Sequence, residues 1–430
     1  MSSSTKPRET PGARIAHFFR ILGPGLITGA ADDDPSGIST YSVAGASTGY
    51  SMLWLTLVST PMMAVIQGMC ARIAMVSGDG LACVMRKRLP RWVAYGLAAT
   101  VIFANTFNVG ADLAGMGAAA SLIVRIPVDA WVFIFGVALL VAEVRLPYEA
   151  IARIFKWLTL ALFAYVITAF IVHPPWALVL RQFVTPQIHL DASWLSTMVG
   201  VLGTTITPYL FFWQSSLMIE EEKEHGKKTR ASRRGTDAQS IRDAHADINA
   251  GMIFSNLVAF FIIVTTASTL GAAGKHDIAT AQQAAEALRP LAGKFASLLF
   301  TLGMVGTGIL AVPVLAGSSA YVAAETFKFR EGLSLPARRA PGFYGVIVTG
   351  VVLGILMNLV GIDPIKALFW SAVLNGVAAV PNLAAVVVLA SDRKLMGEWR
   401  SSLLARAWGW ATVALMGIAV LGMFYFMVRH

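Results

Sequence analysis

The sequence has little charge and almost no cysteine. Only 13% of its 430 residues are Asp, Glu, Lys or Arg, and cysteine occurs twice, at Cys70 and Cys83. Because soluble domains carry about 25% charged residues, this composition excludes an ordinary soluble globular protein. The two cysteines form no metal-ligand pattern, and we interpret them as inert thiols.

The sequence offers little that is typical of the common hydrolases and nucleotide-binding enzymes. No HExxH or GxxxxGK pattern is present, and GxSxG occurs only as the string GASTG at 45–49, at the end of the first apolar run. A membrane-embedded hydrolase would have to combine the aspartates at 32–34 with His173 or His189, which fall in a loop before the sixth apolar segment. The sequence therefore predicts that the protein is not an enzyme and needs no cofactor.

Hydrophobic residues, in contrast, make up 56% of the chain, and the mean hydropathy is +0.66. Apolar runs of membrane-spanning length predict an all-α polytopic membrane protein embedded in a lipid bilayer. We expect eleven spans, at about 20–46 (broken), 51–77, 92–122, 128–146, 151–173, 192–219 (broken), 246–272, 290–324, 342–361, 364–391 and 405–428.

Basic residues fall in the short segments between these spans. The net charge of +10 does not indicate nucleic-acid binding, because 26 of the 34 Lys and Arg residues lie in segments on one side of the predicted membrane. Cytoplasmic loops are enriched in Lys and Arg. We therefore expect a multi-pass protein of the cell membrane with a cytoplasmic N-terminus and an extracellular C-terminus.

Three consecutive aspartates interrupt the first span. Asp32, Asp33 and Asp34 are followed by Pro35, a serine and Gly37. Each carboxylate at bilayer depth costs about 2.5 to 3.5 kcal/mol, so the three must face protein, water or a cation. Proline and glycine break the helix here, and an acidic helix break inside a membrane is suited to a cation site.

A second break is expected in the sixth span, GVLGTTITPYLFFWQSS, at Thr207 and Pro208. Two broken helices at matching positions point to an inverted repeat with its site between them. The second break comes five spans after the first, and an odd number of crossings inverts the second half relative to the first.

These residues resemble the NRAMP family of divalent-metal transporters. GPGLITGAADDDPSG is similar to the family's first helix, in which Asp-Pro-Gly-Asn follows Gly-Pro-Gly, and the match places the family aspartate on Asp34. ADLAGMG resembles a family pattern in the third helix, with Asp112 kept and Gly115 in place of a glutamate. The resemblance implies the leucine-transporter fold, a 5+5 inverted repeat with broken helices 1 and 6 plus an eleventh helix.

The departures from the family pattern bear on ion selectivity. Thr207 stands at the family's methionine, Gly37 at its asparagine, and Tyr209 and Gln214 at its two histidines. A thioether favours softer metals, whereas oxygen ligands suit Mg²⁺, Ca²⁺ or Mn²⁺. These changes resemble the NRAMP-related magnesium transporter branch.

The expected metal site combines residues from three spans. Asp34 is its main ligand, Asp32 and Asp33 act through water or attract the ion at the mouth, and the remaining candidates are Thr207, Gly37, Thr204 and Asn375. Thr207 can equally cap the broken helix, and Tyr209 can simply pack at the break. Asp112 can be a structural partner, and with its family neighbours lost it is expected to lack titratable groups nearby.

The expected division of the chain follows the spans. Residues 1–19 form a cytoplasmic tail, 20–173 the first repeat, 174–191 an extracellular loop, 192–391 the second repeat with a cytoplasmic loop at 220–247, and 392–430 the eleventh helix. The loop at 220–247 begins EEEKEHGKK and is interpreted as a solvated connector, with a regulatory metal sensor as the alternative.

The sequence thus predicts uptake of divalent cations, mainly Mg²⁺ and also Mn²⁺, by alternating access without proton coupling. One alternative is a proton-coupled Mn²⁺ or Fe²⁺ transporter of the NRAMP type. Another is an organic-solute transporter of the same fold, although the triple aspartate would repel a substrate carboxylate. The length allows the chain to work as a monomer.

Overall fold

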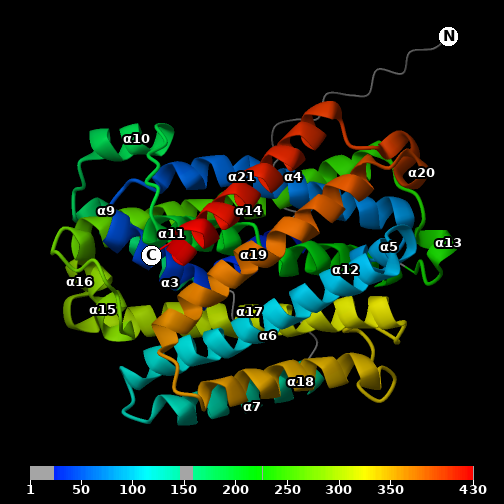
Figure 1. The fold of residues 1–430 in the computed structure, drawn as a ribbon. Helices are drawn as coiled ribbons and strands as arrows, with labels where there is room; N and C mark the ends of the chain where they lie inside the picture. Colours follow the sequence, from blue (N-terminus) through cyan, green and yellow to red (C-terminus); the bar gives the residue numbers. More distant parts are fainter. Residues whose placement is uncertain (1–23, 146–157, 225, 430) are drawn as a thin grey trace, which may run out of the picture.

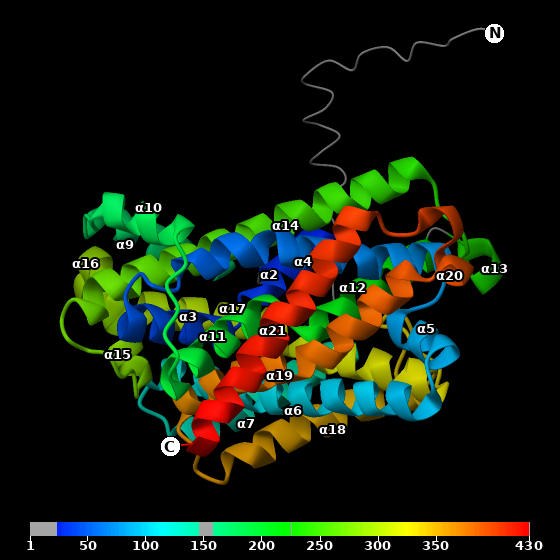
Figure 2. The same ribbon diagram turned by 45° about the horizontal axis from the view of Figure 1, so that its top comes forward.

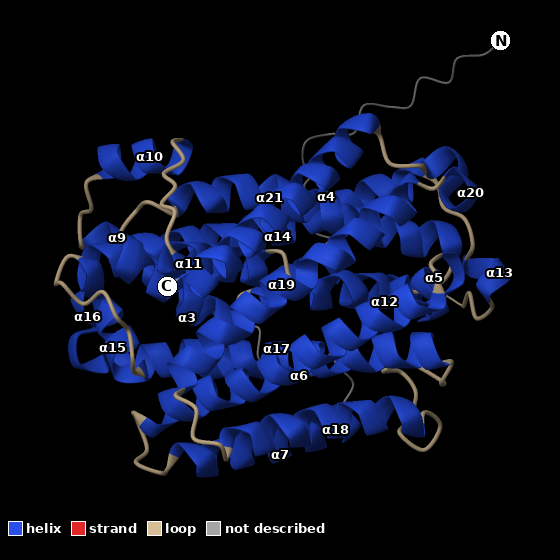
Figure 3. Ribbon diagram, viewed as in Figure 1, coloured by secondary structure: helices blue, strands red, loops and turns tan. Residues whose placement is uncertain are grey.

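The protein is a bundle of long helices (Figure 1). The structure is a computed structural model and describes residues 24–145, 158–224 and 226–429. Within these ranges all regular structure is helical, with no strand (Figure 3). The predicted N-terminal tail therefore lies outside the described residues, as does the start of the predicted fifth span.

The first span is broken where the aspartates predict it. Helix α2 (Pro24–Asp32) ends at the first aspartate and α3 (Pro35–Thr48) begins after the third. Asp34 is the N-cap residue of α3, and its side chain accepts a hydrogen bond from the backbone N–H of Gly37. Pro35 occupies the first position of α3, where its missing N–H costs no hydrogen bond. The aspartates therefore lie at the junction of two short helices.

The second predicted break is confirmed as well. Helix α11 (Ala192–Thr205) and helix α12 (Pro208–Glu224) are separated by Ile206 and Thr207. Pro208 cannot donate the backbone hydrogen bond that would continue α11, so the proline begins a new helix.

The remaining long helices pack around these two broken helices. They are α4 (Leu53–Ser77), α6 (Arg91–Ser121), α7 (Val128–Arg145), α14 (Ala238–Thr266), which continues as a π-helix η2 (Ala267–Gly271), α17 (Ala296–Phe327), α18 (Pro341–Asn358), α19 (Pro364–Ser391) and α21 (Leu403–Arg429). Helix α21 crosses the outside of the bundle over α4 and α19 (Figure 2).

Eight helical segments in the described ranges are long and apolar enough to cross a membrane, or nine if the sharply bent pair α9 and α10 is one span. The other predicted spans do not meet this criterion because they are short or contain charged residues. The pieces α2 and α3 are short because of the break, with 9 and 14 residues. Helix α7 carries Asp129, Glu143 and Arg145 within its 18 residues.

Short helices cap the two ends of the bundle. At one end lie α9 (Phe163–Ile171), which follows η1 (Leu158–Leu162), α10 (Trp176–Val184), α15 (Ala281–Ala285) and α16 (Arg289–Ala292), with η3 (Glu286–Leu288) and η4 (Gly293–Phe295) beside them; at the other lie α5 (Leu81–Arg88), α13 (Arg230–Arg233), α20 (Arg393–Met396) and η5 (Gly397–Trp399). The C-terminus lies at the α10 end (Figures 1 and 2). The described loops that are rich in Lys and Arg thus gather at the α5 end, as expected for one side of a membrane.

Two of the predicted loops are wrong in extent. The segment 174–191 contains α10, and the segment 220–247 is mostly helical, because α12 continues to Glu224 and α14 begins at Ala238. Glu, Lys, Gln and Ala are strong helix formers, so these helices extend past the apolar run that defined them. Asp237 caps the start of α14 by accepting hydrogen bonds from the N–H groups of Gln239 and Ser240.

Glycines let the broken helices approach their neighbours closely. A Cβ atom on Gly29 of α2 would lie 2.4 Å from the carbonyl oxygen of Gly251 on α14, and one on Gly203 of α11 would lie 2.4 Å from the backbone nitrogen of Gly376 on α19. Such contacts leave no room for any side chain. They hold both breaks in the centre of the bundle.

Candidate functional site

The Asp34 carboxylate lies at the first helix break and is almost fully buried, with 2% exposure. Its Oδ1 accepts hydrogen bonds from the Gly37 backbone N–H at 2.6 Å and from the Ser36 hydroxyl at 2.7 Å. Its Oδ2 accepts one from the Asn108 amide of α6 at 3.1 Å. One carboxylate oxygen is therefore used by the helix cap, and the other faces α6.

Asp32 and Asp33 share a hydroxyl on α14. Ser255 Oγ lies 2.6 Å from Asp32 Oδ2 and 3.3 Å from Asp33 Oδ1. Both side chains are fully buried, and Asp32 Oδ1 and Asp33 Oδ2 have no hydrogen-bond partner. The close packing of α2 on α14 places these two aspartates in the interior of the bundle.

Asp112 lies on α6 one turn after Asn108 and faces the same region. It is fully buried, and neither carboxylate oxygen makes a hydrogen bond of good geometry, although the Ser36 amide lies close enough to interact. Asp112 is also within electrostatic range of Asp34 and Tyr209. The prediction that Asp112 lacks titratable neighbours is therefore wrong, since the fold brings Asp34 at the start of α3 and Tyr209 of α12 close to it.

Residues of the second break connect it to the first. The Tyr209 hydroxyl of α12 donates to the Ala31 carbonyl at the end of α2, at 3.1 Å, and the Ser318 hydroxyl of α17 donates to the Tyr209 carbonyl at 2.8 Å. Thr207 Oγ1 is buried without a hydrogen-bond partner. Tyr209 thus joins the two broken helices, and the Thr207 hydroxyl does not cap one, which leaves it available for a ligand.

Gly37 and Thr204 lie next to each other beside the first break, and Asn375 lies on α19, which packs against both α3 and α11. A Cβ atom on Gly37 would lie 3.0 Å from Thr204 Oγ1, so an asparagine at position 37 would crowd α11. Asn375 Oδ1 is buried without a partner, and the residue after it, Gly376, packs directly on α11 beside Thr204. The structure therefore places all three at or next to the contact between α3, α11 and α19.

Four carboxyl groups are buried in this region without a basic partner among the described residues. Asp32, Asp33, Asp34 and Asp112 are between 0% and 2% exposed, and none of the ion pairs among the described residues involves any of them. Buried carboxylates are ordinarily paired with a basic group, protonated, or coordinated to a metal. The arrangement is suited to holding a cation.

The side-chain atoms that could bind a metal ion in this region belong to several chemical groups. In the part of the chain that the structure describes, no three His, Cys, Asp or Glu side chains converge closely enough to hold a metal ion. The oxygen atoms without partners instead belong to carboxylates, amides and hydroxyls, including those of Asn108, Thr207 and Asn375. A bound ion would therefore meet few charged ligands and several neutral oxygens or waters.

Sequence reasoning missed two members of the region. Asn108 is not among the expected site residues, yet its amide donates to Asp34; its position one turn before Asp112 is the signal that could have identified it. Ser255 carried no sequence signal, since it lies in an apolar span far from both breaks. Asn358 of α18, in contrast, ties two helices together, because it donates to the Gly110 carbonyl of α6 at 3.0 Å.

The segment at 220–247 shows no metal site among its described residues. Glu220 pairs with Lys223 at 2.9 Å and accepts a hydrogen bond from Ser334 at 3.0 Å, while Glu222 pairs with Lys227 at 2.5 Å. His225 lies outside the described residues. Two of the clustered glutamates are thus paired with lysines.

Comparison with known families identifies the chain. The model of the natural resistance-associated macrophage protein-like (Nramp) family matches residues 25–426. The chain belongs to the Nramp family. Nramp proteins are transporters, which excludes the hydrolase alternative. The residues that carry the two helix breaks and Asp112 all lie within the matched range.

Curated relatives match nearly the whole Nramp chain. It is 26% identical over 410 residues to the divalent metal cation transporter MntH of Aeromonas hydrophila, covering 92% of this chain and 93% of the relative. It is 27% identical over 424 residues to the protein of the same name from Klebsiella pneumoniae, covering 97% and 96%.

Solved structures confirm the fold. A manganese transporter of Eremococcus coleocola matches with a TM-score of 0.74 at 19% identity, covering 97% of this chain and 88% of the other. A nucleobase-cation-symport-1 family transporter in a closed conformation matches with a TM-score of 0.54 at 13% identity, covering 95% and 93%. This Nramp protein has the predicted leucine-transporter fold.

Proposed function

We propose that this protein carries divalent cations across the membrane, with Mg²⁺ as its main substrate and Mn²⁺ as a second one, by alternating access at the two helix breaks. The supporting observation is the set of buried carboxylates, at positions 32, 33, 34 and 112, without a basic partner in the described ranges. Membership in a family whose relatives are named divalent metal cation transporters supports the substrate class. It leaves the organic-solute alternative without support.

The preference for Mg²⁺ rests on the oxygen character of the site. Thr207 replaces the family's methionine, and the unpartnered atoms around the breaks are oxygens. Mg²⁺ is bound through few carboxylates and keeps several waters, whereas a thioether favours softer metals. Asp34 is the proposed main ligand, and Thr207, Asn375 and Thr204 contribute neutral oxygens. Gly37 leaves space for water. Asp32 and Asp33 contribute negative charge from the buried wall of the site.

One thioether lies near the first break and serves as a control. Met116 of α6 is fully buried. Its sulfur and the Pro35 ring both lie next to Gly308 of α17, so the thioether is close to the first break. If the selectivity is set by oxygen ligands, Met116→Leu leaves the ratio of Mg²⁺ to Mn²⁺ uptake unchanged. A loss of Mn²⁺ transport in this variant would mean that a sulfur ligand contributes.

We also propose that transport is driven by the membrane potential and not by protons. A dication gains about 4.6 kcal/mol from crossing 100 mV, twice the value of about 2.3 kcal/mol for one charge. The positions of both family histidines hold Tyr209 and Gln214, and both are engaged in hydrogen bonds, to Ala31 and to Thr28.

The competing candidate is a proton-coupled Mn²⁺ or Fe²⁺ transporter. It is favoured by Asp112, whose carboxyl lacks a good hydrogen bond and interacts electrostatically with Asp34. A pH-sensitive dye inside Mg²⁺-transporting vesicles separates the two. Voltage-driven uniport predicts that the vesicle interior does not acidify during Mg²⁺ uptake. Acidification that accompanies Mg²⁺ uptake by the wild type and vanishes in Asp112→Asn, together with a change in the Mg²⁺ flux, would establish coupling.

The orientation that we propose places the N-terminus in the cytoplasm and the C-terminus outside. It is supported by the gathering of the Lys- and Arg-rich described loops at the α5 end of the bundle, opposite the C-terminus. A membrane-impermeant biotin reagent applied to intact cells tests it, because a tag after His430 becomes labelled and a tag before Met1 does not.

The central test is metal uptake into proteoliposomes that contain dyes for Mg²⁺, Mn²⁺ and Ca²⁺. The proposal predicts saturable Mg²⁺ uptake that Mn²⁺ inhibits by competition for one site. Uptake of Mn²⁺ or Fe²⁺ with no response to Mg²⁺ at millimolar concentration would refute the magnesium assignment.

A further inference from the structure

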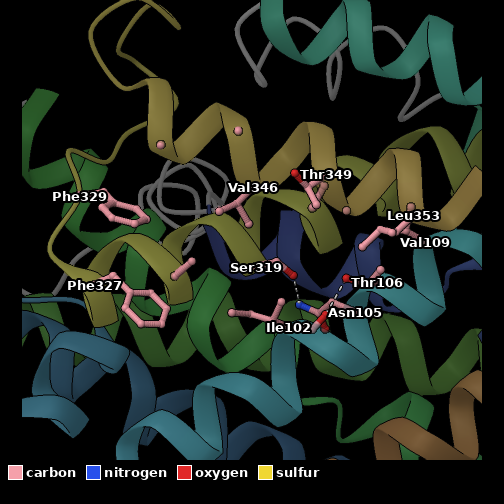
Figure 4. A pocket seen from close by; sticks show the side chains of 15 residues that line it. Ile102, Asn105, Thr106, Val109, Ser319, Phe327, Phe329, Val346, Thr349 and Leu353 are labelled. Carbon is pink, nitrogen blue, oxygen red and sulfur yellow. Dashed lines mark hydrogen bonds between the residues drawn. The ribbon is translucent and has the colours of Figure 1, made fainter.

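A cavity of about 570 Å³ lies between α6, α17 and α18 (Figure 4). Its volume falls in the range of about 300 to 1,000 Å³ that small-molecule sites occupy. Its floor is made by buried residues of α17, among them Ala316, Ser319 and Ala323. The transport site described above uses none of its space.

The cavity is a groove that opens toward the outside of the bundle. Along its α18 wall Gly345, Thr349 and Leu353 are exposed. A Cβ atom on Gly345 would meet nothing within 4 Å, and one on Gly350 would meet only Thr106 Oγ1, at 4.0 Å. In a membrane this open flank faces lipid.

The length of the groove matches one leaflet. It extends along α18 from Gly342 to Leu353, which is about 16 Å at a rise of about 1.5 Å per residue. The hydrocarbon core of a bilayer is about 30 Å thick, so the groove runs through about half of it. A single acyl chain of one leaflet fits this dimension.

The end of the groove at the α17–α18 connection is aromatic and basic. Phe327 and Phe329 line it, with exposures of 54% and 45% (Figure 4). Arg330, Arg338 and Arg339 lie in the same connection, are exposed, and form no ion pair with any described residue. Arginine binds phosphate with two parallel hydrogen bonds, and aromatic rings are favoured at the membrane interface.

We propose that this groove binds one anionic phospholipid, with an acyl chain between α6 and α18 and its phosphate at Arg330, Arg338 and Arg339. Apolar walls select the chain, and the unpaired arginines select a net negative headgroup over a zwitterionic one. With the orientation proposed above, the lipid comes from the cytoplasmic leaflet. The binding itself depends on neither the orientation nor the transported ion.

The bound lipid would contact the helices that carry the transport site. Asn105 of α6 donates to Ser319 Oγ of α17 at 3.0 Å across the groove floor (Figure 4). Asn108, less than one turn further along α6, binds Asp34, and Ser318 of α17 binds the Tyr209 carbonyl. Because the groove and the helix breaks share this wall, the lipid is expected to change the transport rate without touching the ion.

The test is native mass spectrometry of the full-length protein in detergent with dioleoyl phosphatidylglycerol, dioleoyl phosphatidylcholine or inorganic phosphate. We expect one phosphatidylglycerol per chain, with weaker retention of phosphatidylcholine. Gly350→Leu, whose side chain would point across the groove toward Thr106, should weaken phosphatidylglycerol binding by more than tenfold. The matched control is Gly96→Leu, because Gly96 is an exposed glycine of α6 with nothing within 4 Å of its Cβ position and does not line the groove.

A second variant keeps the test decisive if Gly350→Leu does not fold. Replacing Arg330, Arg338 and Arg339 together with Gln removes charges worth about 1 kcal/mol each near an anionic lipid, which is about fivefold per residue and about a hundredfold in total. The preference for phosphatidylglycerol over phosphatidylcholine should then disappear. Equal binding of both lipids to the wild type, or unchanged phosphatidylglycerol binding in both variants, would overturn the proposal. Displacement of the lipid by millimolar inorganic phosphate would show a headgroup site without a chain groove and would also overturn it.

Discussion

Asp34→Asn is the substitution that tests the proposed transport site most directly. Asparagine keeps the shape of aspartate and is an equally good N-cap residue, so its amide oxygen can still accept the Gly37 N–H and Ser36 O–H hydrogen bonds. The fold of the break should therefore survive. The substitution removes one negative charge next to the ion, and it replaces the Oδ2 acceptor of the Asn108 amide with an N–H donor.

The expected loss of affinity is large because the carboxylate is 2% exposed. Removing one member of a buried charge pair costs about 3 to 5 kcal/mol, and each 1.4 kcal/mol is about a tenfold change in affinity. We therefore expect Mg²⁺ binding to weaken by roughly 150-fold to several thousandfold. Isothermal titration calorimetry in detergent measures the affinity, and dye-loaded proteoliposomes measure the flux, which should be abolished.

Asp363→Asn is the matched control. Asp363 precedes Pro364 and caps α19 by accepting hydrogen bonds from the N–H groups of Ile365 and Lys366, so it repeats the Asp-Pro cap of α3 at the end of another helix. It should leave ion binding unchanged. If Asp34→Asn binds Mg²⁺ within tenfold of the wild type while both variants are folded, Asp34 is not the main ligand.

The other predictions concern selectivity, the coupling of the two breaks and cysteine chemistry. Thr207→Met should shift the uptake ratio partly from Mg²⁺ toward Mn²⁺ in a competition assay, because it adds a soft ligand, and an unchanged ratio would contradict the role of this position. Tyr209→Phe removes the hydrogen bond to Ala31, so we expect a loss of thermal stability equivalent to about 0.5 to 1.5 kcal/mol and slower transport, with ion affinity within a few fold. Burial, and then the nearby carboxylates, including Glu325, raise the pKa of the Cys83 thiol. Maleimide labelling at Cys83 should therefore be slow at pH 7, speed up as the pH rises, and be faster at a given pH in Glu325→Gln, while a rate that is independent of pH would argue against thiolate control.

Much of the fold could be predicted because the bilayer constrains the sequence so strongly. Long apolar runs have to form helices when no water is available to satisfy the backbone, so spans such as 364–391 were predicted to within a residue. The two breaks were equally visible, since Pro35 and Pro208 cannot continue a helix. The ends of α12 and α14 were not, because polar helix formers at a membrane surface carry no apolar signal.

The candidate site was predictable only where a residue is anomalous in its own segment. A triple aspartate or an intramembrane Asp112 is conspicuous in an apolar run, and so Asp34 was singled out from sequence. Ser255 is an ordinary residue in such a run, yet its hydroxyl lies 2.6 Å from Asp32. Its role depends on the packing of α2 against α14, which the local sequence does not encode.

The sequence by itself therefore determined that this chain crosses a membrane many times, that two of its helices are broken, and that acidic groups lie at one break, because each of these follows from local composition and backbone chemistry. The tertiary structure alone decided which groups meet. It buried Asp32 and Asp33 against α14, brought Asp112 within electrostatic range of Asp34, and joined the two breaks through Tyr209 and Ala31. These contacts connect residues far apart in the chain, and they are fixed by the packing of whole helices, which depends on all their faces at once.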